Sequence, residues 1–274
     1  MKYPVFGFEK PYFENIKAEF EKFYDEAFYD NFDNLILKKN KNGSDKNILI
    51  AICASENAFL VSNIKDDGKI DVVSLFKNED TITNQRVFYK NKLGYIRKKD
   101  DSLMLDFGTS SKKASEKIIT PGDTLYIKSD FEMLGDFCFT NEKAFALKHI
   151  VALLIKNDYP YNITFAFIRE KAKGAFALGK NLKNEYAFFL TLSEELKEDI
   201  AYLKKEKSYI SSFKTSLIPC HISENILSYA DSYYLSGGSP LSAGLAIKCE
   251  KSENGTFKFK KSSVNKLNNF LNNF

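Results

Sequence analysis

The chain has 274 residues, of which 44% are hydrophobic and 28% charged, an ordinary composition for a soluble globular protein of one large domain or two modest ones. No apolar run approaches the roughly 18 residues of a membrane span, and no signal peptide follows Met1, so we expect a cytoplasmic protein without membrane contact. The net charge of +4 is carried mostly by lysines scattered among Asp and Glu, which argues against nucleic-acid binding.

The N-terminal part of the chain predicts one helix followed by strands. Residues 12–29 carry aromatic and aliphatic side chains at helical spacing, with Glu and Lys between them, which indicates an amphipathic helix. Apolar runs of strand length follow; they are residues 35–37, 47–53 and 58–64. Such short, continuous apolar runs are typical of buried strands.

Between residues 70 and 140 the pattern changes to short alternating segments separated by turns and charges. These segments are residues 70–76, 86–89, 94–97, 103–107, 123–127 and 138–140. Regularly spaced short strands of this kind are typical of a small all-β module. We therefore expect an inserted β-barrel over residues 59–141.

Helices and strands alternate again after this module. The expected helices are residues 143–155, 174–182 and 260–274, and the expected strands are residues 163–168 and 186–192. Cys220-His221 is expected in a loop. This order favours a β module inserted into one α/β domain. The predicted fold class is α/β: a mixed central sheet flanked by helices, formed by residues 1–58 and 142–274, with the small β-barrel between them.

Four cysteines are present, and none of their spacings is typical of a metal site. They are Cys53, Cys138, Cys220 and Cys249. Cytoplasmic thiols stay reduced. We therefore expect each cysteine to act as a small buried hydrophobic residue.

The strand expected at residues 163–168 ends in an unusual set of side chains. Arg169, Glu170, Lys171 and Lys173 follow it, before Gly174 and a run of small residues. In α/β proteins, ligands usually bind at the carboxyl ends of buried strands. Hydrolysis there normally requires carboxylates, histidines or a nucleophile with a base. Lysine and alanine dominate here instead, so the segment poses the question of whether the site is catalytic.

Two segments carry a resemblance to a known family. LMLDFGTSSKKASEKIITPGDTLYIKSDFEMLG, residues 103–135, is followed closely by EKAFALKHIVALL. Together they resemble the glutamyl/deblocking aminopeptidase family of dinuclear-metal aminopeptidases, some of whose members are labelled cellulases or endoglucanases. Residues 12–37 resemble the family's first helix and turn, and residues 244–248 resemble its G-P-A-I-K segment. The resemblance therefore covers nearly the whole chain.

The resemblance implies a fold, a reaction and an assembly. The fold would be the aminopeptidase-like mixed sheet with an inserted barrel. The reaction would be removal of N-terminal residues from short peptides by water activated on two divalent metals, zinc or cobalt, with a glutamate as general base. The family forms dimers that build larger shells, partly through the barrel. We therefore expect self-association, with the barrel serving as a dimerisation domain.

The family's site can be compared with this chain position by position. The residues at the matching positions are Cys53, Ser55, Ala146, Lys171, Ala172 and Thr191. By resemblance, Cys53 replaces a histidine ligand, and Ser55 replaces the aspartate that orients it. A final histidine ligand lies well beyond the G-P-A-I-K segment in the family, whereas this chain stops soon after that segment. We therefore expect a C-terminally shortened member.

The carboxylates of the family's site are also replaced. Ala146 and Thr191 stand where the family has aspartate ligands. Lys171 and Ala172 stand where it has the general base and a glutamate ligand. A shift of one residue in this alignment would bring Glu170 to the general-base position, but it would not restore the set. A divalent ion needs several deprotonated donors, so we expect no metal cofactor.

These replacements predict a degenerate homologue that binds or assembles without catalysis. Its partner would be a peptide or small anion held near Lys171, Lys148 and His149, or an active relative with which it pairs. The alternative is a working aminopeptidase or other hydrolase acting on short peptides. That enzyme would use an atypical metal site or Cys53, which could form a thiol–imidazole dyad with His149.

Overall fold

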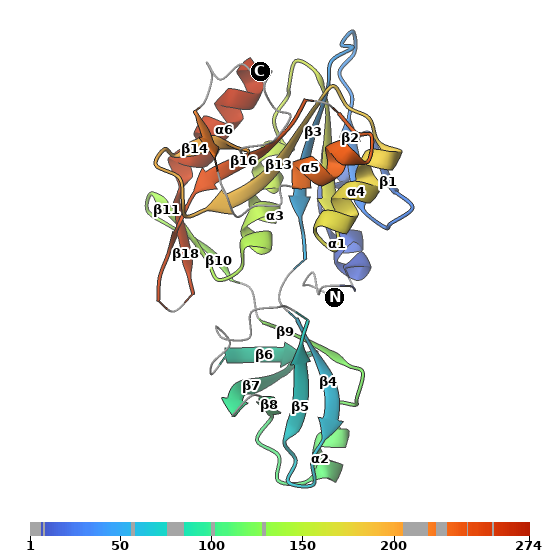
Figure 1. Cartoon of the computed structure of the whole chain (residues 1–274), viewed down its shortest axis with the longest axis vertical. Helices are drawn as coiled ribbons and strands as arrows, with labels where there is room; N and C mark the ends of the chain where they lie inside the picture. Colours follow the sequence, from blue (N-terminus) through green and yellow to red (C-terminus); the bar gives the residue numbers. More distant parts are fainter. Residues whose placement is uncertain are drawn as a thin grey trace. The chain divides into compact units, whose positions relative to one another are not determined.

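The computed structural model describes residues 7, 9–55, 58–75, 85–99, 102–127, 130–204, 219–222, 229–239, 241–253 and 255–274. The chain divides into two compact units (Figure 1). Unit 1 is formed by residues 9–55 and 130–274, and unit 2 contains the segment between them. Residue 76, the last of the strand expected over residues 70–76, lies outside the described residues.

A mixed sheet is the centre of unit 1. Its described strands are β1 (Glu26–Tyr29), β2 (Leu35–Lys39), β3 (Asn47–Cys53), β12 (Asn162–Ile168), β13 (Tyr186–Ser193), β14 (Ile200–Lys204), β15 (Cys220–Ile222) and β16 (Leu241–Lys248). They lie in the order β1-β2-β12-β3-β13-β16-β14-β15. The four central strands β12, β3, β13 and β16 run parallel, so their carboxyl ends share one edge. Strand β2 is antiparallel to β12 and begins at that same edge.

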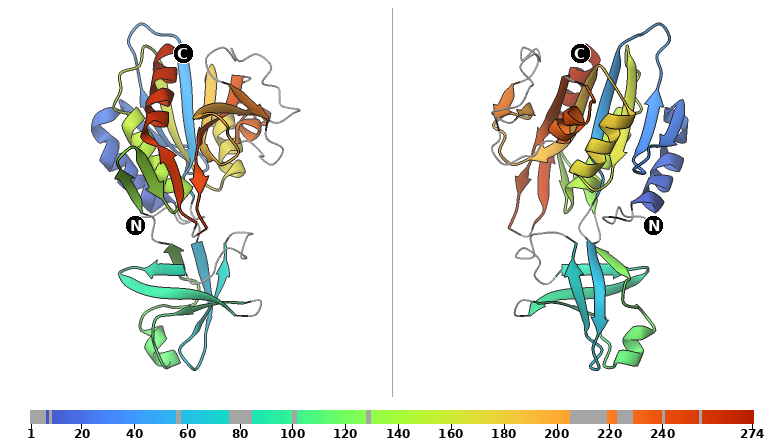
Figure 2. Two further views of the ribbon diagram at one scale, coloured as in Figure 1. Left: turned by 90° about the vertical axis from the view of Figure 1, so that its left-hand side faces the viewer. Right: turned by 45° about the vertical axis from the view of Figure 1, so that its right-hand side comes forward.

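Helices cover both faces of this sheet (Figure 2). One face carries α1 (Lys10–Phe20), α3 (Lys143–Leu154) and α6 (Lys261–Asn273); the other carries α4 (Ala172–Asn181) and α5 (Tyr229–Leu235). Because side chains alternate along a strand, Ile50 and Ile52 of β3 pack beneath the first set, whereas Ala51 and Cys53 pack beneath the second. Burial on both faces explains why the central strands are continuously apolar in sequence.

A second, four-stranded sheet also belongs to unit 1. Its strands are β10 (Phe131–Leu134), β11 (Phe137–Thr140), β17 (Glu250–Lys251) and β18 (Phe257–Lys260), in the order β10-β11-β18-β17. Residues 138–140, expected in the barrel, therefore pair with a strand near the C-terminus. The barrel boundary expected at residue 141 was placed too far along the chain, because this pairing joins segments that are distant in sequence.

Unit 2 is a closed barrel. Its described strands are β4 (Ala58–Ile64), β5 (Ile70–Ser74), β6 (Gln85–Tyr89), β7 (Lys92–Lys99), β8 (Ser102–Asp106) and β9 (Thr124–Ile127), with the short helix α2 (Lys112–Glu116) before the last strand. They close in the order β4-β5-β8-β7-β6-β9. Alternating aliphatic side chains fill the interior. The predicted α/β fold with a small β-barrel is thus confirmed.

The first helix is shorter than its sequence pattern indicates. The helix expected over residues 12–29 ends at Phe20, a single 3₁₀ turn (η1) follows at Glu21–Phe23, and Glu26–Tyr29 form strand β1. This strand pairs antiparallel with β2. Pairing with β2 at the edge of the sheet outweighs the helical spacing of its aromatic residues, because propensity is a weak prior against tertiary contacts.

The prediction of a loop at Cys220-His221 is also wrong. Both residues lie in β15, which pairs parallel with β14 and extends the sheet at one edge. No local pattern predicts this strand, because it has only 3 residues and its partner β14 is not adjacent to it in the chain.

Candidate functional site

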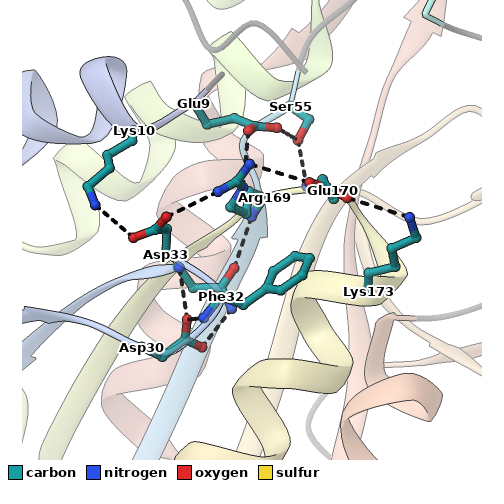
Figure 3. Close-up of polar contacts among 10 residues, drawn as sticks. Glu9, Lys10, Asp30, Phe32, Asp33, Ser55, Arg169, Glu170 and Lys173 are labelled. Atoms are coloured by element: carbon teal, nitrogen blue, oxygen red, sulfur yellow. Dashed lines mark hydrogen bonds and ion pairs between the residues drawn. The ribbon is translucent and has the colours of Figure 1, made fainter. Parts of the chain in front are cut away.

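The carboxyl ends of β3 and β12 meet the start of β2 at one edge of the central sheet, and charged side chains gather there (Figure 3). Arg169 directly follows β12, Ser55 follows β3 by two residues, and Asp33 and Asn34 precede β2. Glu9, at the start of α1, completes the group. We call these residues, together with Asp30 and Glu170, the strand-edge network.

Arg169 is the centre of the strand-edge network. Its Nε lies 3.4 Å from Glu9 Oε2, its Nη1 3.3 Å from Asp33 Oδ2 and its Nη2 3.3 Å from Glu170 Oε1. The guanidinium also lies over the ring of Phe32, 5.6 Å from its centroid. The side chain of Arg169 is 17% exposed and that of Glu9 is 0% exposed. A buried charge persists only when it is paired and hydrogen-bonded, so each of these groups depends on the others.

Neutral side chains fix the loops that carry these charges. Ser55 Oγ donates to Glu9 Oε1 at 2.6 Å and accepts from the backbone N–H of Glu170 at 3.1 Å. Asn34 Oδ1 accepts from the backbone N–H of Arg169 at 3.0 Å, and its Nδ2 donates to Gly174 O at 2.9 Å and Asp30 Oδ2 at 2.7 Å. The loops after β3 and β12 are therefore tied to the turn before β2.

The turn between β12 and α4 has a strained backbone. Glu170 has φ of 48° and Lys171 has φ of 54°, both in the left-handed region that favours glycine. Residues held in such conformations cost on the order of 1–3 kcal/mol each, so the surrounding contacts must impose the turn. The strand-edge network supplies them through Ser55 and Arg169.

Cys53 is buried beneath α4 and α5. Burial raises the pKa of its thiol, although hydrogen bonds with Ser55 and Tyr229 and the charge of Lys171 oppose the rise. Burial and the neighbouring Cys53 also raise the pKa of Tyr229. The thiol is therefore protonated at neutral pH, and the thiolate is the nucleophilic and metal-binding form.

The remaining residues expected at the site belong to helices α3 and α4 and strand β13. Ala146 of α3 is buried in the core on the opposite face of the sheet from Cys53. Thr191 is partly buried on β13 beside β16, and Ala172 begins α4. Lys148 Nζ binds both carboxylate oxygens of Glu19 on α1, at 2.6 and 2.7 Å. Cys53, Ser55, Lys171 and Ala172 lie at the strand edge described above, and Thr191 lies on β13 one residue after Leu190, which pairs with Ile52 of β3.

His149 lies in an aromatic setting on α3. Its ring stacks on Phe131 at 4.4 Å between centroids and meets Phe145 edge-on at 4.9 Å. Burial, with a smaller contribution from Lys148, lowers its pKa to about 4. Cys53 packs on the other face of the sheet, so the structure does not bring the expected Cys53–His149 dyad together.

Acidification should destabilise the wild type more than a His149→Phe variant. The unfolded imidazole has a pKa of 6.5 and the folded one about 4, so between these pH values the unfolded chain binds a proton that the folded chain rejects. Stability present above pH 6.5 is thus lost as the pH falls, by on the order of 2 kcal/mol after allowance for partial exposure. Urea unfolding at several pH values measures this difference. Parallel pH profiles for the two proteins would contradict it.

The donor set does not fit the two metals that the family resemblance implies. The described part of the chain contains no group of three or more His, Cys, Asp or Glu side chains placed to hold a metal ion. The carboxylates of the strand-edge network face a guanidinium. Among the matching positions, Ala146 has no donor atom and Cys53 is a protonated thiol. Metal ligands must be deprotonated.

Sequence reasoning missed five residues of this site: Glu9, Asp30, Asp33, Asn34 and Tyr229. One available signal was the charged residue Glu9 directly before an amphipathic helix. The second was the turn Asp30–Asn34, rich in residues that hydrogen-bond their own backbone, as Asp30 does here. Neither signal indicates that both segments reach Arg169.

A mixed sheet with helices on both faces and a barrel inserted after β3 is the fold of aminopeptidases of known structure. An endoglucanase from Thermotoga maritima matches with a TM-score of 0.77 at 19% identity, over 99% of this chain and 93% of that chain. A TET aminopeptidase from a marine sediment archaeon of the Thaumarchaeota matches with a TM-score of 0.80 at 17% identity, over 97% and 90%. The TET1 peptidase of Pyrococcus horikoshii matches with a TM-score of 0.76 at 18% identity, over 98% and 94%.

Comparison of the sequence with protein-family models gives no match, and comparison with curated proteins gives none either. At identities of 17 to 19%, the structural likeness defines the fold. The chain therefore has the aminopeptidase-like fold that the sequence resemblance implied. None of the described helices is long and apolar enough to cross a membrane.

Proposed function

We propose that this protein is a non-catalytic protein of aminopeptidase fold that binds peptides or small anions at its strand edge. The observation that carries the proposal is the position of Arg169, whose guanidinium forms ion pairs with the carboxylates of Glu9, Asp33 and Glu170. Carboxylates committed to a guanidinium are poor ligands for a divalent ion, because the fixed cation repels the metal. The described residues therefore offer no set of side chains that could hold a metal ion and activate a water molecule.

Lys171 is the proposed anchor for the ligand. It is exposed and directly precedes α4, a helix of 10 residues. The first N–H groups of a helix carry partial positive charge and favour anions. A lysine ammonium beside them suits the carboxylate of a peptide or a small acid. Lys148 and His149 are not part of this proposal, since each is engaged elsewhere.

One observation favours an active hydrolase instead. Strained residues cluster at functional sites, and the turn at Glu170 and Lys171 is strained on both residues. Glu170 also retains a carboxylate beside the strand end, with a side chain 22% exposed. An enzyme would have to release this carboxylate from Arg169 and recruit metal ligands during binding of substrate.

Two measurements on purified protein separate the non-catalytic function from the enzymatic one. Elemental analysis should find no stoichiometric zinc, cobalt or manganese. Aminoacyl p-nitroanilides, with and without added zinc or cobalt, should release no product above the rate of a heat-denatured control. Close to two metals per chain together with hydrolysis would reject the non-catalytic function and support the enzyme.

Calorimetric titration with short acidic peptides tests the binding site. The wild type should bind, Lys171→Glu should lose at least tenfold in affinity, and Lys180→Glu should bind like the wild type. Lys180 is a matched control because it is an exposed lysine of the same helix, near its other end. Equal binding by all three proteins, or none by the wild type, would remove Lys171 from the site.

Self-association is a further part of the proposal. One structural neighbour is a dodecamer, and the TET1 peptidase of Pyrococcus horikoshii can assemble into a tetrahedron or a large octahedral shell. The barrel has exposed Val73, Leu93 and Tyr95 side chains, which suit a dimerisation surface. Light scattering on the same preparations should give at least a dimer mass. A monomer at micromolar concentration would reject this part alone.

A further inference from the structure

An aromatic cluster lies at the amino ends of the central strands, the opposite edge from the strand-edge network. Lys46 directly precedes β3, Tyr161 directly precedes β12, and Tyr186 is the first residue of β13. Strands β12 and β13 flank β3 and run parallel to it, with Asn162 paired with Asn47 and Tyr186 with Ile48. Phe274, after the last residue of α6, reaches the same place. The tertiary structure therefore joins four residues from four separate segments.

The ammonium of Lys46 lies among three aromatic rings. Its Nζ is 4.6 Å from the ring centroid of Phe274, 5.2 Å from that of Tyr161 and 5.5 Å from that of Tyr186. A cation within about 6 Å of a ring centroid is attracted by the negative face of the ring. Three rings around one nitrogen form the arrangement with which proteins bind alkylated ammonium groups.

Contacts outside the cage hold the rings in place. Tyr161 stacks on Tyr159 at 5.7 Å, and its hydroxyl donates to Leu271 O of α6 at 2.5 Å. Phe274 meets Tyr186 edge-on at 4.8 Å and Phe188 edge-on at 5.1 Å. The three walls are therefore packed against the core and α6 independently of Lys46, as a preformed binding site requires.

We infer that Tyr161, Tyr186 and Phe274 form an alkylammonium-binding cage whose resident ligand is Lys46. The contact between the Lys46 ammonium and the Phe274 ring connects the loop before β3 to the end of α6. Aromatic faces favour weakly hydrated cations over strongly hydrated ones, so the cage accepts N-methylated ammonium groups better than a primary amine. When the Lys46 side chain is shortened, a small quaternary ammonium ion takes its place. This inference is independent of the function proposed for the strand edge.

Choline is the probe, and 3,3-dimethylbutan-1-ol is its neutral isostere. Choline should bind the Lys46→Ala variant at least tenfold more tightly than it binds the wild type, and it should raise the melting temperature of that variant. The double variant Lys46→Ala/Phe274→Leu should lose this binding. The neutral isostere should bind Lys46→Ala at least tenfold more weakly than choline. Equal binding of choline and its isostere, or no binding to Lys46→Ala, would overturn the inference.

A second measurement uses the wild type, so it does not depend on the folding of Lys46→Ala. Reductive methylation with ¹³C-formaldehyde labels every lysine amine as a dimethyl group. The dimethyl signal of Lys46 should be shifted upfield by the ring currents of the three rings, and it should be missing from Lys46→Met. The inference would also be overturned if the wild-type spectrum had no upfield dimethyl signal, or if that signal persisted in Lys46→Met.

Discussion

Arg169→Met should destabilise the folded protein by about 3–5 kcal/mol, the range found when one partner of a buried ion pair is removed. Methionine replaces the length of the side chain but leaves Glu9 as a charge with an exposed fraction of 0%. Asp33 and Glu170 lose the same partner but keep Lys10 and Lys173, respectively, so the buried charge of Glu9 accounts for most of the loss. Urea unfolding followed by circular dichroism measures the loss.

Two matched variants make this result specific to the network. Lys148→Met removes a lysine whose partner Glu19 is 50% exposed, so it should cost about 1 kcal/mol or less. Adding Glu9→Gln to Arg169→Met removes the buried charge and should restore part of the lost stability, because contacting residues are energetically coupled. A loss below 1 kcal/mol for Arg169→Met, or no recovery in the double variant, would contradict the pairing that we assign to Arg169.

Gly174→Ala should destabilise the protein by about 3 kcal/mol, at the upper end of the range for overpacking. In most helices a glycine-to-alanine change stabilises by roughly 1 kcal/mol. Here a Cβ would lie 2.0 Å from Arg169 O and 2.9 Å from Asn34 Oδ1. Both atoms belong to the strand-edge network and cannot retreat without breaking it, so the sign of the effect reverses.

Lys173→Ala is the control for this prediction. The residue precedes Gly174 in α4, and its side chain is 77% exposed, so its replacement should change stability by less than about 0.5 kcal/mol. Urea midpoints of the two variants provide the comparison. If Gly174→Ala were as stable as the wild type, the close approach of α4 to the end of β12 would be disproved.

Local sequence patterns predict part of the fold. The central strands at residues 47–53, 163–168 and 186–192 are almost continuously apolar, because helices cover both faces of the sheet there. The amphipathic pattern of residues 260–274 likewise matches α6. Where a strand pairs with a segment that is distant in sequence, the local hydrophobic pattern does not predict which sheet the strand joins. Residues 138–140 alternate like barrel strands, yet they pair with β18.

The candidate site was found from sequence only in part. The segment after β12 was singled out because charged and small residues follow a buried strand. Arg169 and Glu170 do lie at the strand edge (Figure 3), and Lys171 follows them directly. The partners of Arg169 could not be found in this way. Glu9 and Asp33 are more than a hundred positions away in sequence, and no spacing rule links them.

The sequence by itself determined the α/β class, the inserted barrel and the absence of the expected donors at residues such as Ala146, since composition and period are local properties. Only the tertiary structure decided which charges meet. Parallel strands bring residues from remote segments to a common edge, so it alone placed Glu9 and Asp33 around Arg169 at one end and Lys46 among three rings at the other. The energy of a buried charge depends on these neighbours, and neighbours in space are fixed by topology.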